Sequence, residues 1–209
     1  MKSYETVNES TGEITSKFLY FTGQPKEYRF DARLGQFNLN GTKPLLDKSG
    51  KPVKSFTFQP IAYRFFTAQM FGRERVEKWF EVFFADEKNH VSGIMFNSTN
   101  VEPYEQLMLT DCLYEGLTLC DLIITATPKE VVSKKDPNKK WFVCELSSEL
   151  ADLETVKALQ EFDSDNKVFR KDSVKDNFEL GLIKSHYFET LVIETQYQEP
   201  AQIEETQPA

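Results

Sequence analysis

Between Lys54 and Leu146, apolar side chains follow a strand-like pattern in five runs and a helix-like pattern in one. The five runs predicted to be strands are Lys54–Thr67, Trp79–Phe84, His90–Phe96, Leu117–Thr127 and Trp141–Leu146. The helical run, predicted over 99–115, lies between the third and fourth strands, and Gly116 ends it. The pattern therefore predicts a mainly β domain that contains some helix, with the order β-β-β-α-β-β.

The first predicted strand contains a proline, Pro60, between two alternating halves. A proline cannot donate a hydrogen bond to a neighbouring strand, so inside a strand it marks a bulge or a bend. We therefore expect this strand to bend at Pro60, so that its two halves serve two parts of the sheet.

The flanking segments predict further elements. Ser16–Phe21 and Gly35–Asn40 have the composition of N-terminal strands, and Ser148 is expected to cap a second helix that ends near Phe162. The chain divides into a flexible arm at 1–15, a main domain at 16–162, an extension packed on that domain at 163–193 and a disordered acidic tail at 194–209.

The net charge is -8, and the negative charge is concentrated near the end of the sequence. From Ser185 to Ala209 there is no lysine or arginine, but there are five glutamates. The remainder is close to balanced, which argues against a protein coated uniformly with positive potential, as histone-like DNA packers are. A local basic site is compatible with this balance.

No membrane segment is predicted. The sequence has no apolar run of the roughly 18–20 residues that would span a bilayer, and its first residues, Met1–Glu5, are polar. We therefore expect a cytoplasmic protein without a membrane partner.

The residue types that carry catalysis are sparse or unsuitably spaced. The three cysteines form no C-x-x-C pair, and neither of the two histidines has a neighbour at metal-ligand spacing. The glycine-rich motifs that bind nucleotides are missing from the sequence. We therefore expect no enzymatic activity, no metal and no cofactor. The alternative, a metal-dependent nuclease, would have to assemble Asp121 and Glu145 on adjacent strands.

The connection before the last predicted strand is rich in lysine. Pro128–Lys140 contains five lysines and two acidic residues, and Trp141 follows directly. Single-stranded nucleic acid is bound by such combinations, because aromatic faces stack on bases while Lys and Arg neutralise phosphates. The residues predicted to bind nucleic acid are Tyr63, Arg64, Phe65, Arg73, Arg75, Lys78, Trp79, Lys134, Lys135, Lys139, Lys140 and Trp141.

With this strand order, basic connection and acidic end, the chain resembles OB-fold single-stranded DNA-binding proteins of the divergent type found in bacteriophages and mobile elements. The resemblance implies a five-stranded OB-fold-like barrel with a helix between strands 3 and 4, plus N-terminal strands and a C-terminal helical extension. It also implies a protein that coats or protects single-stranded DNA, or RNA, during replication or recombination in a bacterial or phage-infected cell. Replication or recombination proteins would bind the acidic tail.

One feature departs from that family. Its bacterial members close the acidic run with an aromatic residue, whereas this sequence ends Glu204-Glu205-Thr206-Gln207-Pro208-Ala209. A second interpretation of the β domain is a structural or assembly module, for example of a virus particle, that contacts only protein. That interpretation predicts exposed apolar patches and no salt-dependent affinity for DNA.

Overall fold

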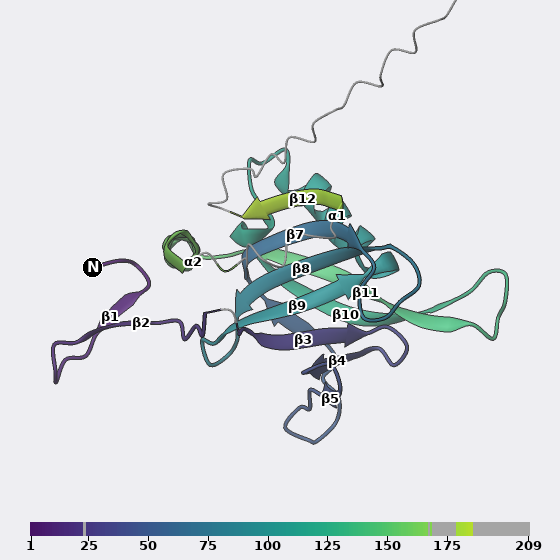
Figure 1. Ribbon diagram of the computed structural model, residues 1–209, viewed down its shortest axis with the longest axis horizontal. Helices are drawn as coiled ribbons and strands as arrows, with labels where there is room; N and C mark the ends of the chain where they lie inside the picture. The colour runs from purple at the N-terminus through teal and green to yellow at the C-terminus, as the bar shows by residue number, and fades with distance from the viewer. Residues whose placement is uncertain (23, 167, 169–178, 186–209) are drawn as a thin grey trace, which may run out of the picture.

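In the computed structural model, which describes residues 1–22, 24–166, 168 and 179–185, two β-sheets form the body of the protein (Figure 1). The larger sheet has seven strands in the order β12-β7-β8-β9-β3-β4-β5. In that order its strands are Glu179–Ser185, Pro60–Ala68, Glu77–Ala85, Val91–Asn97, Lys26–Asp31, Gln36–Leu39 and Lys43–Pro44. Neighbouring strands are antiparallel, except that β3 is parallel to β9. The prediction of a mainly β protein with some helix is confirmed.

The smaller sheet has three antiparallel strands in the order β11-β10-β6. Its strands are β11 (Lys140–Leu150), β10 (Leu122–Val132) and β6 (Phe56–Phe58). One face of each sheet contributes to a shared core, in which Ile124 from β10 packs with the aromatic residues of the larger sheet. Phe80 is central to this core, because its ring centroid lies 4.5 Å from those of both Phe65 and Tyr104.

The predicted bend at Pro60 is confirmed. β6 and β7 are separated only by Gln59, yet β6 pairs with β10 in the small sheet and β7 pairs with β8 in the large one. The register between β7 and β8 shifts between Pro60 and Ala62, which is the irregularity expected beside a proline. A single stretch of chain therefore joins the two sheets.

A closed five-stranded barrel is not shown, because both sheets are open. The physical reason lies in β3, a strand that the pattern of the sequence did not predict. β3 pairs with β9 and carries β4 and β5 with it, so the large sheet continues beyond β9. β11 meets this added hairpin through one backbone hydrogen bond, from Phe142 N to Ala32 O at 2.7 Å.

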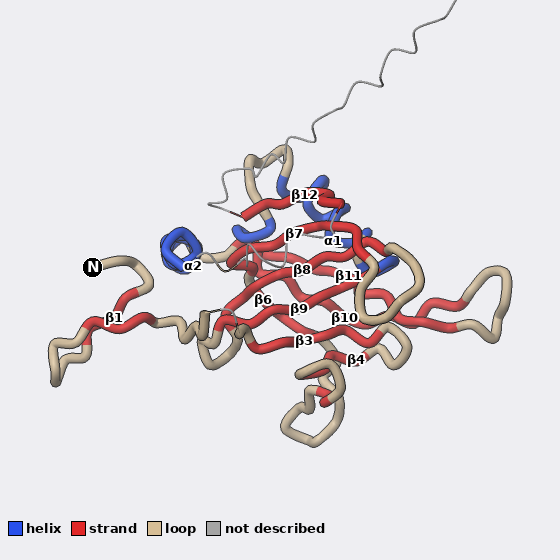
Figure 2. The backbone as a smooth tube through the Cα atoms, in the orientation of Figure 1, coloured by secondary structure: helices blue, strands red, loops and turns tan. Residues whose placement is uncertain are grey.

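The helices lie beside the sheets (Figure 2). α1 (Glu102–Leu107) follows a 3₁₀ turn at Ser98–Asn100 and continues as a π-helical turn over Met108–Cys112, in place of the regular helix predicted over 99–115. α2 (Leu153–Asn166) begins later than predicted, since Ser148 belongs to β11. Asp152 caps α2 instead, because its side chain accepts a hydrogen bond from Thr155 N at 2.8 Å.

The N-terminal arm is more ordered than predicted. β1 (Glu5–Val7) and β2 (Ile14–Ser16) form a two-stranded hairpin, whereas most of the strand expected at Ser16–Phe21 is irregular. The arm contacts α2, since Lys2 Nζ lies 2.6 Å from Asp165 Oδ2 and the ring of Tyr4 meets that of Phe162 edge-on. The N-terminal arm, whose sequence has no periodicity, is therefore positioned by contacts with residues about 160 positions later in the chain.

Part of the predicted extension at 163–193 lies on the body, because β12 pairs with β7 at the edge of the large sheet. The acidic tail at 194–209 lies outside the described residues. Within the described part of the chain, no helix has the length and apolar character needed to cross a membrane.

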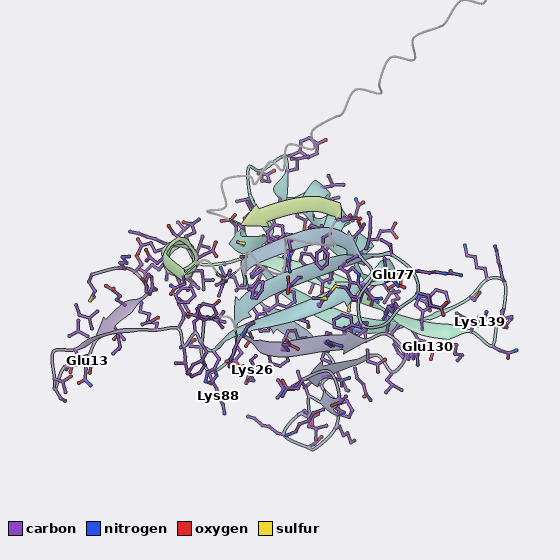
Figure 3. The ribbon with its side chains drawn as sticks, viewed as in Figure 1. Glu13, Lys26, Glu77, Lys88, Glu130 and Lys139 are labelled. Atoms are coloured by element: carbon purple, nitrogen blue, oxygen red, sulfur yellow. The ribbon has the colours of Figure 1, made fainter. Side chains whose placement is uncertain are left out.

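The turn between β8 and β9 contains an acidic residue, Asp86, that stabilises the fold. Its carboxylate accepts hydrogen bonds from Lys26 Nζ at 2.6 Å and from the backbone N–H groups of Lys88 and His90 at 2.9 and 3.0 Å. Burial opposes ionisation, but the hydrogen bonds from Lys26 and the two amides outweigh it and lower the pKa of Asp86 to about 2. Lys26 and Lys88 are both labelled near this turn in Figure 3.

Replacing Asp86 with asparagine is expected to lower the free energy of unfolding by about 1–2 kcal/mol at pH 7. A carboxyl group whose pKa is depressed in the folded protein stabilises it above the unfolded pKa, and this contribution is lost as the pH falls towards 2. Urea denaturation at pH 7 and at pH 2.5 should therefore show a difference between wild type and Asp86→Asn that shrinks in acid. An equal difference at both pH values would contradict the assigned role of the carboxylate.

Candidate nucleic-acid interface

All arginines of the described residues gather around two adjoining pockets of the large sheet. The first pocket has a volume of about 500 Å³ and is lined by Arg29 and Arg64 among others. The second has a volume of about 770 Å³, and its lining includes four arginines. Arg29 and Phe71 line both pockets, and no lysine lines either. We call these two pockets together the arginine groove; its arginines are Arg29, Arg33, Arg64, Arg73 and Arg75.

The floor of the arginine groove is a row of side chains that crosses five strands. Successive register pairs connect its members: Arg64 on β7 with Glu81 on β8, Glu81 with Met95 on β9, Met95 with Arg29 on β3, and Arg29 with Asn38 on β4. Because side chains alternate between the two faces of a strand, this row lies opposite the face that carries Phe80 and the shared core. The row therefore occupies the outer face of the sheet.

Two elements bound this outer face. At one end α2 packs on it, with Phe162 in a cluster with Ala62 and Phe83. At the other end lies the β7–β8 connection, which stands at the opposite side of the sheet from α2 in Figure 1. The groove lies between these two elements, because its first pocket is lined both by Phe83, which packs with α2, and by Phe71, which belongs to the β7–β8 connection.

The β7–β8 connection brings an aromatic ring over the groove. Phe71 and Gly72 have φ angles of 55° and 69°, a left-handed conformation that turns the chain back towards the sheet. The Arg29 guanidinium lies 3.8 Å from the centroid of the Phe71 ring, whose residue is 51% exposed. Beneath this connection, Trp79 Nε1 donates a hydrogen bond to Ala68 O at 3.0 Å. Phe71 therefore offers a supported and accessible ring.

The electrostatics of the groove differ along its length. In the floor, Arg64 Nε and Glu81 Oε2 form an ion pair at 2.5 Å, and burial raises the pKa of Glu81 although Arg64 opposes that shift. Arg73 is paired with Glu77. The other three arginines, Arg29, Arg33 and Arg75, form no ion pair among the described residues.

Acidic residues also line the groove, so it carries no large excess of positive charge. They are Glu27, Asp31, Glu74, Glu77 and Glu81. The Asp31 carboxylate is occupied locally, since it accepts the backbone N–H groups of Arg33 and Leu34 at 2.8 and 3.2 Å. Recognition in this groove would therefore depend on individual guanidinium groups and their planar donor geometry, and less on the overall potential.

No protein-family model, curated protein or solved structure matches this chain.

Three of the predicted binding residues are core residues. Tyr63 is fully buried, Phe65 is 5% exposed and Trp79 is 3% exposed. Tyr63 and Phe65 point into the shared core, and Trp79 packs under the β7–β8 connection with Phe66 and Met70. The prediction that these rings stack on bases is therefore wrong, because none of them has an accessible face. Alternation along β7 and β8 places aromatic residues on both faces of the sheet.

The predicted cations separate into two groups. Arg64, Arg73 and Arg75 belong to the arginine groove, whereas Lys78 lies outside it and pairs with Glu105 of α1 at 2.8 Å. The remaining predicted residues belong to the β10–β11 hairpin, which projects from the body with Glu130 and Lys139 along it (Figure 3).

The hairpin is longer than the sequence predicted, because both strands extend through residues expected to form the loop. Three exposed lysines near its tip, Lys134, Lys135 and Lys139, form no ion pair among the described residues, and we call them the hairpin lysines. Lys140 is paired with Glu130 at 2.9 Å, and Trp141 is half-buried. The hairpin lysines form a cationic surface separate from the groove lining.

The residues needed for the nuclease alternative are not brought together. Asp121 precedes β10 and binds Thr118, while Glu145 is paired with Lys129 at 2.7 Å. Since Glu145 lies opposite Thr127, about 20 Å of extended strand separates the two carboxylates. Within the described residues, no group of three or more His, Cys, Asp or Glu side chains is arranged to hold a metal ion.

Sequence reasoning missed four residues of the groove: Arg29, Arg33, Asn38 and Phe71. A signal for Arg29 was present, because residues 27–31 alternate charged and aromatic side chains with the period of a strand. The use of arginine gave no signal in advance, because only the structure shows that five of the six arginines line this one groove; the sixth, Arg170, lies outside the described residues.

Proposed function

We propose that this protein binds single-stranded nucleic acid, with the arginine groove as its principal contact surface. The observation that carries the proposal is the gathering of Arg29, Arg33, Arg64, Arg73 and Arg75 around one groove with an accessible aromatic ring above it. Arginine provides a planar fork of donors for phosphate and a flat surface for stacking. Phe71 supplies the apolar face on which a base stacks.

The order of the elements supports an OB-fold-like interpretation. β6 and β7, β8, β9, α1, β10 and β11 follow one another in the order β-β-β-α-β-β, and the bent first strand pairs with both β8 and β10. In OB folds, the outer face of the second and third strands and two adjoining loops bind oligonucleotides. Here the corresponding strands are β8 and β9, which contribute Glu81 and Met95 to the groove floor.

The β10–β11 hairpin corresponds to the second of those loops. Its lysines Lys134, Lys135 and Lys139 are exposed and adapted to neutralising phosphates of a strand that extends beyond the groove. Lysine serves this role as a mobile point charge, whereas the groove arginines fix the geometry. The protein would thus coat single-stranded DNA, or RNA, without enzymatic activity, and its acidic tail would recruit replication or recombination proteins.

A protein-interaction module is the second candidate, because apolar side chains are exposed around the end of α1. Leu109, Leu113 and Tyr114 are 48%, 55% and 87% exposed. An apolar surface of this kind is typical of a site for another protein. It lies on residues outside the arginine groove, so the two functions predict different binding residues.

Fluorescence titration of the full chain with oligo-dT, at several salt concentrations, tests the proposal. If each of the three arginines without an ion pair neutralises one phosphate, the counterions condensed on those phosphates are released. At about -0.7 per contact, the log–log slope of affinity against salt is expected to be about -2 or steeper. A duplex of equal length should bind on the order of tenfold more weakly, because its bases are not available for stacking. Affinity that is undetectable even at low salt would reject the proposal and favour the protein-interaction module.

A further inference from the structure

Asn38 is a buried residue whose side-chain amide forms no hydrogen bond among the described residues. The residue is 5% exposed, and its Oδ1 is fully buried without a hydrogen bond. Its Nδ2 also forms no hydrogen bond with the described part of the chain, but this atom is not fully enclosed. Buried polar groups are normally paired, because leaving one without a partner costs free energy. Asn38 is therefore an exception that requires a physical reason.

The other buried asparagine behaves in the usual way. Asn100 is 1% exposed; its Nδ2 donates to Phe142 O at 3.2 Å, and its Oδ1 accepts from Cys144 N at 2.7 Å. Asn100 thus fastens β11 to the 3₁₀ turn before α1. The contrast shows that this fold can satisfy a buried amide, and that it leaves the amide of Asn38 without a hydrogen bond among the described residues.

Asn38 is the last residue in the row of side chains that forms the groove floor. It stands opposite Arg29 in the β3–β4 register and lines the second pocket together with Arg33, Arg73 and Arg75. The amide therefore faces the same space as the guanidinium groups to which we assign phosphate binding. A ligand in this pocket would meet Nδ2 of Asn38 directly, and a rotation of the side chain about its Cβ–Cγ bond would be needed to present Oδ1, which has no accessible surface of its own.

The chemistry of the amide selects among the parts of a nucleic acid. A phosphodiester has acceptors only, so it can pair with Nδ2 but leaves Oδ1 without a donor. The same holds if the amide is rotated by half a turn, because both of its groups are without partners. The edge of a nucleobase carries a donor beside an acceptor and satisfies both groups of an amide at once, as in the pairing of Asn with adenine.

We infer that Asn38 binds the hydrogen-bonding edge of one unstacked nucleobase, while the neighbouring arginines bind the adjoining phosphates. This inference rests on the proposed function and adds to it a base contact of defined residue and chemistry. Thymine fits such a contact, since its imide presents an N–H donor next to a carbonyl acceptor. The groove would consequently distinguish a strand that carries bases from a bare sugar–phosphate chain.

The test compares Asn38→Leu with wild type on two ligands: oligo-dT, and an abasic oligodeoxynucleotide of equal length. Leucine has a similar size and needs no hydrogen bond, so Asn38→Leu is expected to melt at the wild-type temperature or above it. Its affinity for oligo-dT is expected to fall on the order of tenfold, the value of one two-bond contact to a base. Its affinity for the abasic strand should change less than about twofold.

Asn100→Leu is the matched control for stability, because the same substitution there removes two hydrogen bonds and should lower the melting temperature. If Asn38→Leu also melts early, Asn38→Ala replaces it in the binding measurement on the folded fraction. An equal loss on both ligands would place Asn38 on the sugar–phosphate chain and overturn the inference, as would an unchanged affinity for oligo-dT. Failure of wild type to bind oligo-dT would instead reject the proposed function itself, and the inference with it.

Discussion

Replacing Arg29, Arg33 and Arg75 together by alanine is expected to weaken the binding of oligo-dT about 100-fold at low salt. None of the three is engaged in an ion pair among the described residues, so each guanidinium is available to a phosphate. A contact of about 1 kcal/mol from each gives a loss of about 3 kcal/mol, which corresponds to roughly two orders of magnitude. The salt slope should decrease by about 2, because about 0.7 is lost for each contact.

The control removes the same charge elsewhere. Lys48, Lys51 and Lys54 are exposed and line neither pocket of the groove, so their joint replacement by alanine should change the affinity less than about threefold. A third variant replaces Lys134, Lys135 and Lys139 and measures the contribution of the hairpin lysines. If the control variant loses as much affinity as the groove variant, binding depends on net charge and the groove is not the site.

Replacing Trp79 by alanine is expected to lower the free energy of unfolding by about 3–5 kcal/mol. The ring is buried on the outer face of β8 in a cluster with Phe66 and Met70, and its Nε1 is hydrogen-bonded to Ala68 O. Truncation would leave a cavity under the β7–β8 connection and an unpaired carbonyl group. Urea denaturation followed by circular dichroism measures the loss.

Phe71 provides the comparison, because it lies over the same tryptophan but is 51% exposed. Phe71→Ala should cost less than about 1 kcal/mol of stability and yet lower the affinity for oligo-dT by about 1–3 kcal/mol, the value of a stacked base. Trp141, which is half-buried on the hairpin, remains a predicted stacking residue and is tested in the same assay. If Trp79→Ala had normal stability but bound oligo-dT weakly, Trp79 would instead be a nucleic-acid-binding residue, as the sequence predicted.

The strands of the main domain could be predicted because their signals are local. The alternation in β8 and β9 and the proline in the first strand are properties of a few successive residues, and each produced the element expected of it. The ends of the hairpin strands were less predictable. Pro128, expected at the start of a loop, lies inside β10, at a point where β10 pairs with β11 and no longer with β6. Only β11 flanks β10 at this point, and a strand accommodates proline where one of its sides is an edge.

The candidate site was predicted only in part, for the same physical reason. Arg73 and Arg75 belong to a loop next to a predicted strand, so proximity in sequence was enough to associate them with Arg64. Arg29 and Asn38 join them because β3 pairs in parallel with β9, a strand that lies more than sixty residues later in the chain. Local pattern contains no information on which distant strand becomes a neighbour.

Local pattern was sufficient for a mainly β chain, the approximate position of most of its strands, the bend at Pro60 and the division of each strand into two faces. Alternation along a strand sets which side chains share a face, since that follows from backbone geometry alone. Which face became core depended on the packing of the folded chain. Tyr63 and Phe65 are covered by the small sheet and α1, while Arg64 between them lies in the groove between α2 and the β7–β8 connection. Burial depends on what packs against a face, and the elements that cover this sheet come from distant parts of the chain.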